Sequence, residues 1–330
     1  MNTELPGVAV IMPVLNEELH LAESVAAITG QDYPGDLQIA LALGPSTDGT
    51  DEVAAALAAG DPRIVLVPNP TGRTPAALNA ALAATSHPVV VRVDGHALLP
   101  PDYVSTAVAV LQRTGADNVG GVMAAEGTTP FERAVACAMR SPLGVGAASF
   151  HTGGEEGEAP TVYLGAFRRA AIERVGGYDE AYVRAQDWEM NHRIRQTGGL
   201  VWFTPRMQVI YRPRPTVKAL AKQYFHYGRW RREIVRQHRT VSPRYLAPPV
   251  ALTAVATGLA GATVAAVTGH KRAWLGLLPA TSYLVLIAVG SAAISRQQPA
   301  AVRARVPVAL VTMHMSWGAG FLTSPGDLRT

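Results

Sequence analysis

The stretch VRVDGHALLP (residues 91–100) ends a run of β-forming residues with an acid and an imidazole two positions apart. On an extended chain Asp94 and His96 lie on the same side, with backbones about 7 Å apart, so both side chains can reach one divalent ion. A carboxylate and an imidazole suit Mn²⁺ or Mg²⁺, with phosphate oxygens filling the remaining positions. The alternative is structural: a strand-end aspartate that caps the next turn, and a satisfied surface histidine.

The residues before and after this motif alternate between strand and helix patterns. Apolar strand patterns cover residues 7–14, 37–43, 63–68 and 88–94, and helix patterns cover 18–29, a stretch from 51, and 74–85. Continuous apolar strands that alternate with helices predict an α/β fold with a mainly parallel sheet flanked by helices. Ligands bind such sheets at the carboxyl ends of strands, where Asp94 and His96 are placed.

The composition changes near residue 246. Residues 246–268 and 273–295 contain no charged residue, and each is about as long as the ~20 residues that cross a bilayer core. A third apolar run, 306–322, is shorter and contains His314, so it could span, tilt or re-enter. Buried helices of a soluble domain are the alternative, although these normally show a polar face. An ionisable residue within a membrane is commonly functional, but His314 could equally lie at the interface, so we leave it outside the catalytic set.

Charge is distributed unevenly. Between Pro205 and Tyr245 there are eleven Lys or Arg residues and one acid, Glu233, which indicates phosphate groups or an anionic membrane surface as a neighbour. This block precedes the first apolar run and residues 295–305 follow the second, so both are expected on the cytoplasmic side, with the short loop GHKR opposite. The single cysteine, Cys137, fits a reducing compartment. The opening MNTELPGVAVIMPV has no basic n-region, and we expect no signal peptide.

These patterns predict three parts of the chain. Residues 1–215 form a cytoplasmic catalytic domain, residues 216–245 a basic amphipathic interfacial helix, and residues 246–330 a membrane domain. The membrane domain is expected to contain two spans and a third short span or re-entrant segment.

Seven motifs taken together resemble the inverting family-2 glycosyltransferases of the GT-A type, in particular the membrane-bound branch related to succinoglycan-biosynthesis glucosyltransferases. The resemblance covers roughly residues 7–232, and its order and spacing make it specific. Its motifs are VIMPVLNEE (10–18), GPSTDGT (44–50), GRTPAALNAAL (72–82), VRVDGHA (91–97), YLGAFRR (163–169), GGYDE (176–180) and QDWEMNHRIRQTGG (186–199).

The resemblance implies roles for single residues. Asp94 and His96 stand where the family has its DxD metal motif, with His replacing the second Asp, and Asp187 matches the catalytic base. The residues implied in donor binding are Pro13, Asn16, Glu17, Arg73, Asn79 and Asp94. The residues placed near the acceptor or its phosphate are Glu189, Arg193, Arg229 and Trp230.

Glycosyl transfer requires groups of these kinds. A divalent cation neutralises the charge that develops on the leaving diphosphate, and the transition state is oxocarbenium-like. An inverting displacement also needs a base opposite the leaving group to take the proton of the acceptor hydroxyl, the role implied for Asp187. The structural alternative for Asp187 is a helix N-cap, a position that Asp favours.

The chain departs from the family pattern in two places. Leu43, Gly44 and Pro45 replace the acidic turn that contacts the nucleotide base in the family, and Asp48 matches a later position that serves the turn and the next helix. UDP is therefore the donor nucleotide by resemblance alone. The order Gln223, Arg229, Trp230 is similar to the QxxRW signature of processive synthases, but the spacing is longer and does not indicate processivity.

Three further features have alternative interpretations. Residues 223–239 could meet donor or acceptor phosphates or could form an interfacial anchor, and Arg212 and Arg214 could contact phosphates or face the membrane. The Gly/Glu-rich stretch 149–161 is interpreted as a loop that could cover the acceptor, with His151 as a solvated side chain.

The sequence therefore predicts a metal-dependent, inverting glycosyltransferase anchored in the cell membrane by several passes, with its catalytic domain in the cytoplasm. It would move a sugar from a nucleotide-sugar donor to a polyprenyl-linked saccharide in polysaccharide or glycan biosynthesis. One alternative is transfer to polyprenyl phosphate itself, and another is a non-catalytic membrane scaffold that binds sugar nucleotides. Nucleic-acid binding is disfavoured because the basic block adjoins an uncharged span and no recognition motif is present.

Overall fold

The computed structural model describes residues 5–146, 148–269 and 271–329, and the chain divides into two compact units. The first unit runs to Ala124, resumes from Gly153 to Tyr211 and includes Arg329. The second comprises Ala125–Thr152 and Arg212–Leu328. The expected domain boundary at residue 215 lies close to Arg212. Residues 125–152, which sequence patterns did not distinguish from the first part, belong to the second unit with the apolar helices.

The first unit contains an eight-stranded sheet with the order β3-β2-β1-β4-β7-β5-β8-β6. Its strands are β1 (Val8–Val14), β2 (Leu37–Leu43), β3 (Ile64–Pro68), β4 (Val89–Arg92), β5 (Asn118–Ala125), β6 (Gly157–Glu158), β7 (Tyr163–Arg168) and β8 (Val201–Tyr211).

The four strands that the sequence predicted form the parallel part of this sheet. β1 pairs in parallel with β2 from Val8↔Leu37 to Val14↔Leu43, and with β4 up to Ile11↔Arg92. The side chains of β1, β2 and β4 are almost all buried, as expected for strands covered on both faces, whereas Val65 and Leu66 of the edge strand β3 are exposed. The pairs β4–β7, β7–β5 and β6–β8 are antiparallel, so the complete sheet is mixed.

Helices pack against the sheet of the first unit. In the first unit they are α1 (Leu21–Thr29), α2 (Thr50–Gly60), α3 (Thr74–Ala83), α4 (Tyr103–Thr114), α8 (Arg169–Arg174) and α9 (Gln186–Gln196). α3 packs against β1 and β2, and α4 against β7 and β8. α1 begins at Leu21 rather than Glu18 because the preceding loop is held by the β2–α2 turn: the Glu17 amide donates to Thr50 Oγ1 (2.7 Å).

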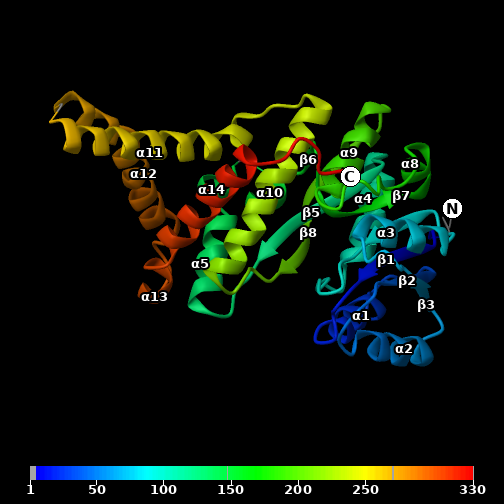
Figure 1. Cartoon of the computed structure of the whole chain (residues 1–330). Helices are drawn as coiled ribbons and strands as arrows, with labels where there is room; N and C mark the ends of the chain where they lie inside the picture. The colour runs from blue at the N-terminus through cyan, green and yellow to red at the C-terminus, as the bar shows by residue number, and fades with distance from the viewer. Residues whose placement is uncertain (1–4, 147, 270, 330) are drawn as a thin grey trace. The chain divides into compact units, whose positions relative to one another are not determined.

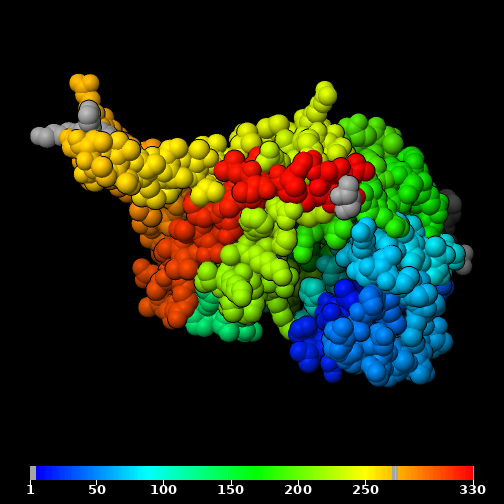
Figure 2. Space-filling model, in the orientation of Figure 1, coloured from blue at the N-terminus to red at the C-terminus, as the bar shows by residue number. Residues whose placement is uncertain are grey.

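Among the residues described, the regular secondary structure of the second unit is helical apart from Ala125 at the end of β5. Its helices are α5 (Pro130–Met139), α6 (Pro142–Val145), α7 (Ser149–Thr152), α10 (Val217–His238), α11 (Pro243–Thr268), the 3₁₀ helix η1 (Lys271–Leu277), α12 (Leu278–Ile294), α13 (Ala300–Arg303) and α14 (Val306–Leu322). α14 lies along α10, as Figure 2 shows, and also contacts α5 and α11. Glycines allow the close approach: a Cβ on Gly228 of α10 would lie 2.1 Å from the Trp317 carbonyl oxygen of α14.

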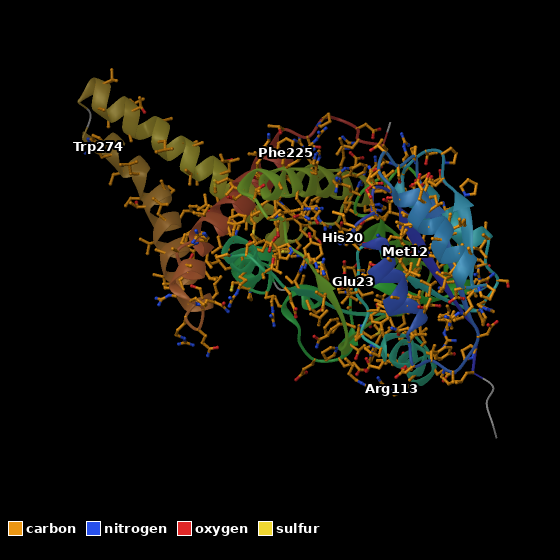
Figure 3. The ribbon with its side chains drawn as sticks, turned by 90° about the horizontal axis from the view of Figure 1, so that it is seen from below. Met12, His20, Glu23, Arg113, Phe225 and Trp274 are labelled. Atoms are coloured by element: carbon orange, nitrogen blue, oxygen red, sulfur yellow. The ribbon has the colours of Figure 1, made fainter. Side chains whose placement is uncertain are left out.

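Two helical segments in the described part of the chain are long and apolar enough to cross a membrane, Pro243–Thr268 and Trp274–Ile294. Only 11% and 17% of their most apolar windows are buried, which disfavours core helices of a soluble domain. They meet at one end and diverge from it (Figure 1), and Trp274, half exposed, marks that end, which is remote from Phe225 of α10 (Figure 3).

The third apolar run differs from the other two. It forms α14, whose Val306, Leu310 and Met313 are fully buried. In the loop GHKR, expected opposite the basic block, His270 lies outside the described residues.

Candidate active site

A buried arginine joins the two acids that the sequence singled out. Arg92, the last residue of β4, is 3% exposed; its Nη2 donates to Asp94 Oδ1 (3.0 Å), and its Nη1 donates to Asp187 Oδ1. The two aspartates lie 93 positions apart in sequence, at the end of β4 and the start of α9. Their side chains retain about a quarter of their exposure, so one guanidinium holds two carboxylates at the protein surface.

Arg92 is charged in this setting. Burial, the largest single effect, would lower its pKa, but the Asp94 carboxylate together with Tyr178 and Tyr163 raises the pKa above its ordinary value. Its Nε and the hydroxyl of Tyr178 are buried without hydrogen-bond partners among the described residues. Burial also raises the pKa of Tyr178 to about 12, so this hydroxyl stays neutral beside the two acids.

Asp187 is not a helix cap. The N-cap of α9 is Ala185, in the left-handed region at φ 61°, and Asp187 follows inside the first turn with its carboxylate directed to Arg92. Within the helix, buried Asn191 accepts from Asn118 of β5 (2.6 Å) and donates to Thr161 (3.0 Å). These polar contacts fix α9 to the sheet and so position Asp187.

His96 contacts a residue predicted to bind the donor. Its Nδ1 lies 2.7 Å from Glu17 Oε1, in the loop after β1. Metal-binding histidines are commonly oriented by such a carboxylate on their other ring nitrogen. Within the described ranges no group of three or more His, Cys, Asp or Glu side chains could enclose an ion.

The residues present nevertheless fit a divalent cation that is shared with substrate. Asp94 and His96 are both partly exposed at the end of β4, one offering a carboxylate and the other an imidazole. Mg²⁺ in particular is held by one or two carboxylates plus substrate phosphates rather than by a complete protein cage. The donor set matches that arrangement.

The loops after β1 and β2 are tied together beside this site. Asn16 has a φ of 55°. Its side-chain Oδ1 accepts from the Thr47 backbone amide (2.8 Å), and its backbone amide donates to Ser46 Oγ (3.1 Å). Asp48 accepts from the Thr50 hydroxyl (2.5 Å) and from the Thr50 and Glu18 amides, which lower its pKa. Asp48 therefore serves the turn and the start of α2, the position that the sequence comparison indicated.

The remaining predicted donor residues have different surroundings. Pro13 lies in β1, in register with Ala42 of β2. Arg73 precedes α3 and is exposed, whereas Asn79 is partly buried. The Asn79 side chain accepts from the Tyr178 amide (2.8 Å) and donates to the Tyr178 carbonyl (2.9 Å) and to Glu180 (3.1 Å). Asn79 thus holds the loop that leads to α9.

Glu189 and Arg193, which the resemblance placed near the acceptor, pair with each other. Glu189 is 2% exposed, and its carboxylate accepts from Arg193 Nε (2.5 Å) and Nη2 (2.7 Å). Arg193 also donates to the Val175 carbonyl (2.5 Å). The pair links α9 to the end of α8.

Arg229 and Trp230 belong to α10, in the second unit. Trp230 is 8% exposed, and the Arg229 guanidinium carbon lies 6.0 Å from the Phe225 ring centre. His314 is held between helices of the same unit: its Nδ1 lies 3.1 Å from Tyr283 Oη and its Nε2 2.8 Å from the Leu143 carbonyl oxygen. The imidazole therefore joins α12, α14 and α6.

One prediction for residues 149–161, a solvated His151, is wrong. His151 is not a solvated side chain, because α7 places it against Phe150 (ring centres 4.4 Å apart) with a buried Nδ1. Burial and the nearby Arg244 charge lower its pKa to about 4. Further along, Glu156 forms an ion pair with Arg113 and accepts from Trp202 Nε1 (2.9 Å), so the expected loop is anchored there.

Sequence reasoning missed Arg92. Arg92 lies in an apolar strand, two positions before Asp94. Its second partner, Asp187, follows 95 positions later in the sequence. The only sequence signal was an arginine at a position where a buried strand otherwise holds valines.

Comparison with known proteins supports the assignment of fold and family. The model of glycosyl transferase family 2 matches residues 9–176. The succinoglycan biosynthesis protein ExoA of Rhizobium meliloti is 32% identical over 329 residues, covering 97% of this chain and 95% of the relative.

Two solved structures share the fold. A mannosyltransferase, PcManGT from Pyrobaculum calidifontis, in complex with GDP-Man and Mn²⁺, superposes with a TM-score of 0.57 at 23% identity, covering 94% of this chain and 88% of that one. S. aureus TarS (1–349) with UDP gives 0.51 at 13% identity, covering 96% and 90%. The mixed sheet, the motif at the end of β4 and these matches lead to one conclusion: the chain is a GT-A-type glycosyltransferase that belongs to glycosyl transferase family 2.

Proposed function

We propose that the chain transfers a sugar from a nucleotide-sugar donor to a lipid-linked saccharide, with inversion at the sugar carbon and with a divalent cation, during polysaccharide biosynthesis. The observation that carries this proposal is the Arg92 bridge between Asp94 and Asp187. It holds the acid proposed for the donor diphosphate next to the acid proposed as base. An inverting displacement requires these two functions on opposite faces of one sugar.

The proposed step uses Asp187 as the base. The acceptor hydroxyl gives its proton to Asp187 while its oxygen forms a bond to the anomeric carbon, and the bond from that carbon to the diphosphate oxygen breaks. The electron pair leaves on the nucleoside diphosphate. Arg92 occupies Oδ1 of Asp187, so the proton would be taken by Oδ2 of the partly exposed carboxylate.

Asp94 and His96 would hold a divalent cation at the donor diphosphate. When bound, the cation would neutralise charge that develops on the leaving group. Glu17 would keep the His96 ring in a fixed orientation through its 2.7 Å contact. The two solved structures that share the fold support a nucleotide sugar as the class of donor, because one contains GDP-Man and Mn²⁺ and the other contains UDP. We propose a UDP-sugar as donor.

The acceptor and the location are proposed from the second unit. Two uncharged segments with mostly exposed surfaces, Pro243–Thr268 and Trp274–Ile294, would anchor the chain in the cell membrane, with the basic residues before them on the cytoplasmic side. An acceptor carried on a polyprenyl diphosphate would then lie at the cytoplasmic surface of that membrane. The similarity to a succinoglycan biosynthesis protein supports a polysaccharide pathway.

The test uses detergent-purified full-length chain with UDP-, GDP- and dTDP-sugars, Mn²⁺ and a polyprenyl-diphosphate-linked saccharide. Release of nucleoside diphosphate gives the rate, and NMR of the product gives the anomeric configuration. Asp187→Asn should lower kcat by about 10²–10⁴-fold and leave nucleotide affinity within about threefold. The matched control is Asp51→Asn, another acid in the first turn of a helix, which should change neither.

Turnover of Asp187→Asn at the wild-type rate would refute the base assignment. Retention of the donor's anomeric configuration would refute the single displacement. Transfer to polyprenyl phosphate but not to longer lipid-linked acceptors would identify the alternative product, a lipid-phosphate sugar.

A further inference from the structure

A cluster of cations surrounds one tyrosine of the second unit. The guanidinium carbons of Arg231, in α10, and Arg244, in the first turn of α11, lie 4.3 Å and 5.0 Å from the centre of the Tyr245 ring. Arg244 Nη2 also donates to the Tyr245 hydroxyl (3.1 Å). Tyr245 is 6% exposed, so two positive charges meet on one buried ring where α10 gives way to α11.

Like charges lie close together in this cluster. Nε and Nη1 of Arg231 are buried, and burial lowers the pKa of this guanidinium to about 10, with the Arg244 charge acting in the same direction. Arg244 likewise lowers the pKa of His151, whose Nδ1 is buried and has no hydrogen-bond partner in the described part of the chain. The carbon chain of Arg244 passes over Gly146, where an added Cβ would lie 3.0 Å from Arg244 Cβ.

The surrounding unit does not restore the balance. Its two segments, residues 125–152 and 212–328, contain 17 Lys or Arg and 4 Asp or Glu. Three of these acids are engaged elsewhere: Glu132 caps α5, Glu233 accepts from Arg236 and Gln237, and Asp327 lies 3.8 Å from Arg236. Burying like charges close together is costly, and a bound anion relieves that cost.

We propose that Arg231, Arg244 and His151 form a binding site for a phosphate or diphosphate group, outside the Asp94–Asp187 site. Planar guanidinium groups bind phosphate oxygens in pairs, and Tyr245 holds both groups in place. The site immediately precedes the uncharged segment of α11, where the headgroup of a membrane lipid would lie. The favoured ligand is therefore the diphosphate of a polyprenyl carrier, which rests on the function proposed above.

The experiment measures binding to the full-length chain in detergent without donor and without turnover. The probes are a polyprenyl diphosphate, inorganic pyrophosphate and UDP with Mn²⁺. Arg244→Gln should weaken polyprenyl diphosphate binding at least tenfold and change UDP affinity less than twofold. Arg239→Gln, an exposed arginine of the same basic segment, is the matched control and should change each affinity less than twofold.

Two further variants protect the test against simple loss of folding. Arg244→Lys keeps the charge without the planar pair of donors and should recover part of the lost affinity. Tyr245→Phe keeps the ring and should bind within about threefold of wild type. Thermal unfolding of each variant is recorded in parallel, and Arg231→Gln is used if Arg244→Gln unfolds.

The probes separate the possible sources of the phosphate. Selective loss of the polyprenyl ligand supports a lipid site, and equal loss of pyrophosphate supports a site for the phosphate group itself. Unchanged binding of both in a folded Arg244→Gln protein overturns the proposal. Sugar transfer with no phosphate binding at this cluster would reject only the cluster, whereas binding without transfer would reject only the proposed function.

Discussion

The charged side chains of interest are arranged differently in the two units. In the sheet unit, functional charges are paired over short distances: Arg92 with two aspartates, His96 with Glu17, and Arg193 with Glu189. In the helical unit, Arg231 and Arg244 share an aromatic ring within a segment rich in cations. Paired charges fix side chains in position for chemistry, whereas unbalanced charges create demand for an anion. The contrast is the basis on which we propose reaction in the sheet unit and ligand capture in the helical unit.

The largest effect is expected from breaking the bridge in the sheet unit. Arg92→Met leaves Asp94 and Asp187 without their shared cation, and removal of one partner of a buried ion pair costs about 3–5 kcal/mol. Because the carboxylates are partly exposed, we expect about 2–4 kcal/mol of lost unfolding free energy, together with loss of turnover.

Denaturant unfolding and kcat measure this effect. Arg113→Met, which removes the half-exposed partner of Glu156, is the control and should cost less than about 1 kcal/mol. Equal losses in the two variants would remove the distinction between a functional bridge and a surface pair.

In the helical unit the expected effect depends on pH. His151 has a pKa of about 4 when folded against an ordinary 6.5, so the unfolded state binds more protons between these values. Stability is fully present above pH 6.5 and falls, by up to about 3 kcal/mol, as pH drops toward 4.

His151→Gln should remove this part of the pH dependence, measured as the unfolding midpoint between pH 7 and pH 4. His20→Gln, in the sheet unit, should leave it in place. An unaltered pH profile in His151→Gln would show that the imidazole titrates alike in both states, against the buried position described.

A smaller effect separates two residues that the sequence treated alike. Asn79→Ala breaks three hydrogen bonds to the loop before α9 and should cost about 1–2 kcal/mol of stability, with nucleotide affinity within about threefold. Arg73→Gln, at an exposed position, should weaken nucleotide binding and leave the unfolding midpoint unchanged. The reverse result would place Asn79 at the donor and Arg73 in the framework.

Local pattern was sufficient for much of the fold. The strands at 7–14, 37–43, 63–68 and 88–94 lie within one or two residues of β1, β2, β3 and β4, because buried parallel strands are continuous apolar runs. The antiparallel pairing of β4 with β7 was not predicted, since Val91 and Ala166 are 75 positions apart and no local signal records their contact.

The residues of the candidate site likewise divide into those that local sequence pattern identified and those that it did not. The motif Asp94–His96 and the acid Asp187 were selected from their sequence context. Arg92, which joins them, could not be, because its role depends on where α9 begins in space. The same limit explains His151: its loop composition suggested solvent, but in α7 its ring packs against Phe150 with Nδ1 buried.

The most direct test of the central claim is calorimetric titration of UDP and GDP into the wild-type chain and Asp94→Asn, each with Mn²⁺ and with EDTA. The proposed site predicts binding of one nucleotide to wild type with Mn²⁺, and its loss in EDTA and in Asp94→Asn. Mn²⁺ binding followed by electron paramagnetic resonance should show the same dependence on Asp94. Equal nucleotide affinity in all four conditions would contradict a metal-assisted donor site at the end of β4.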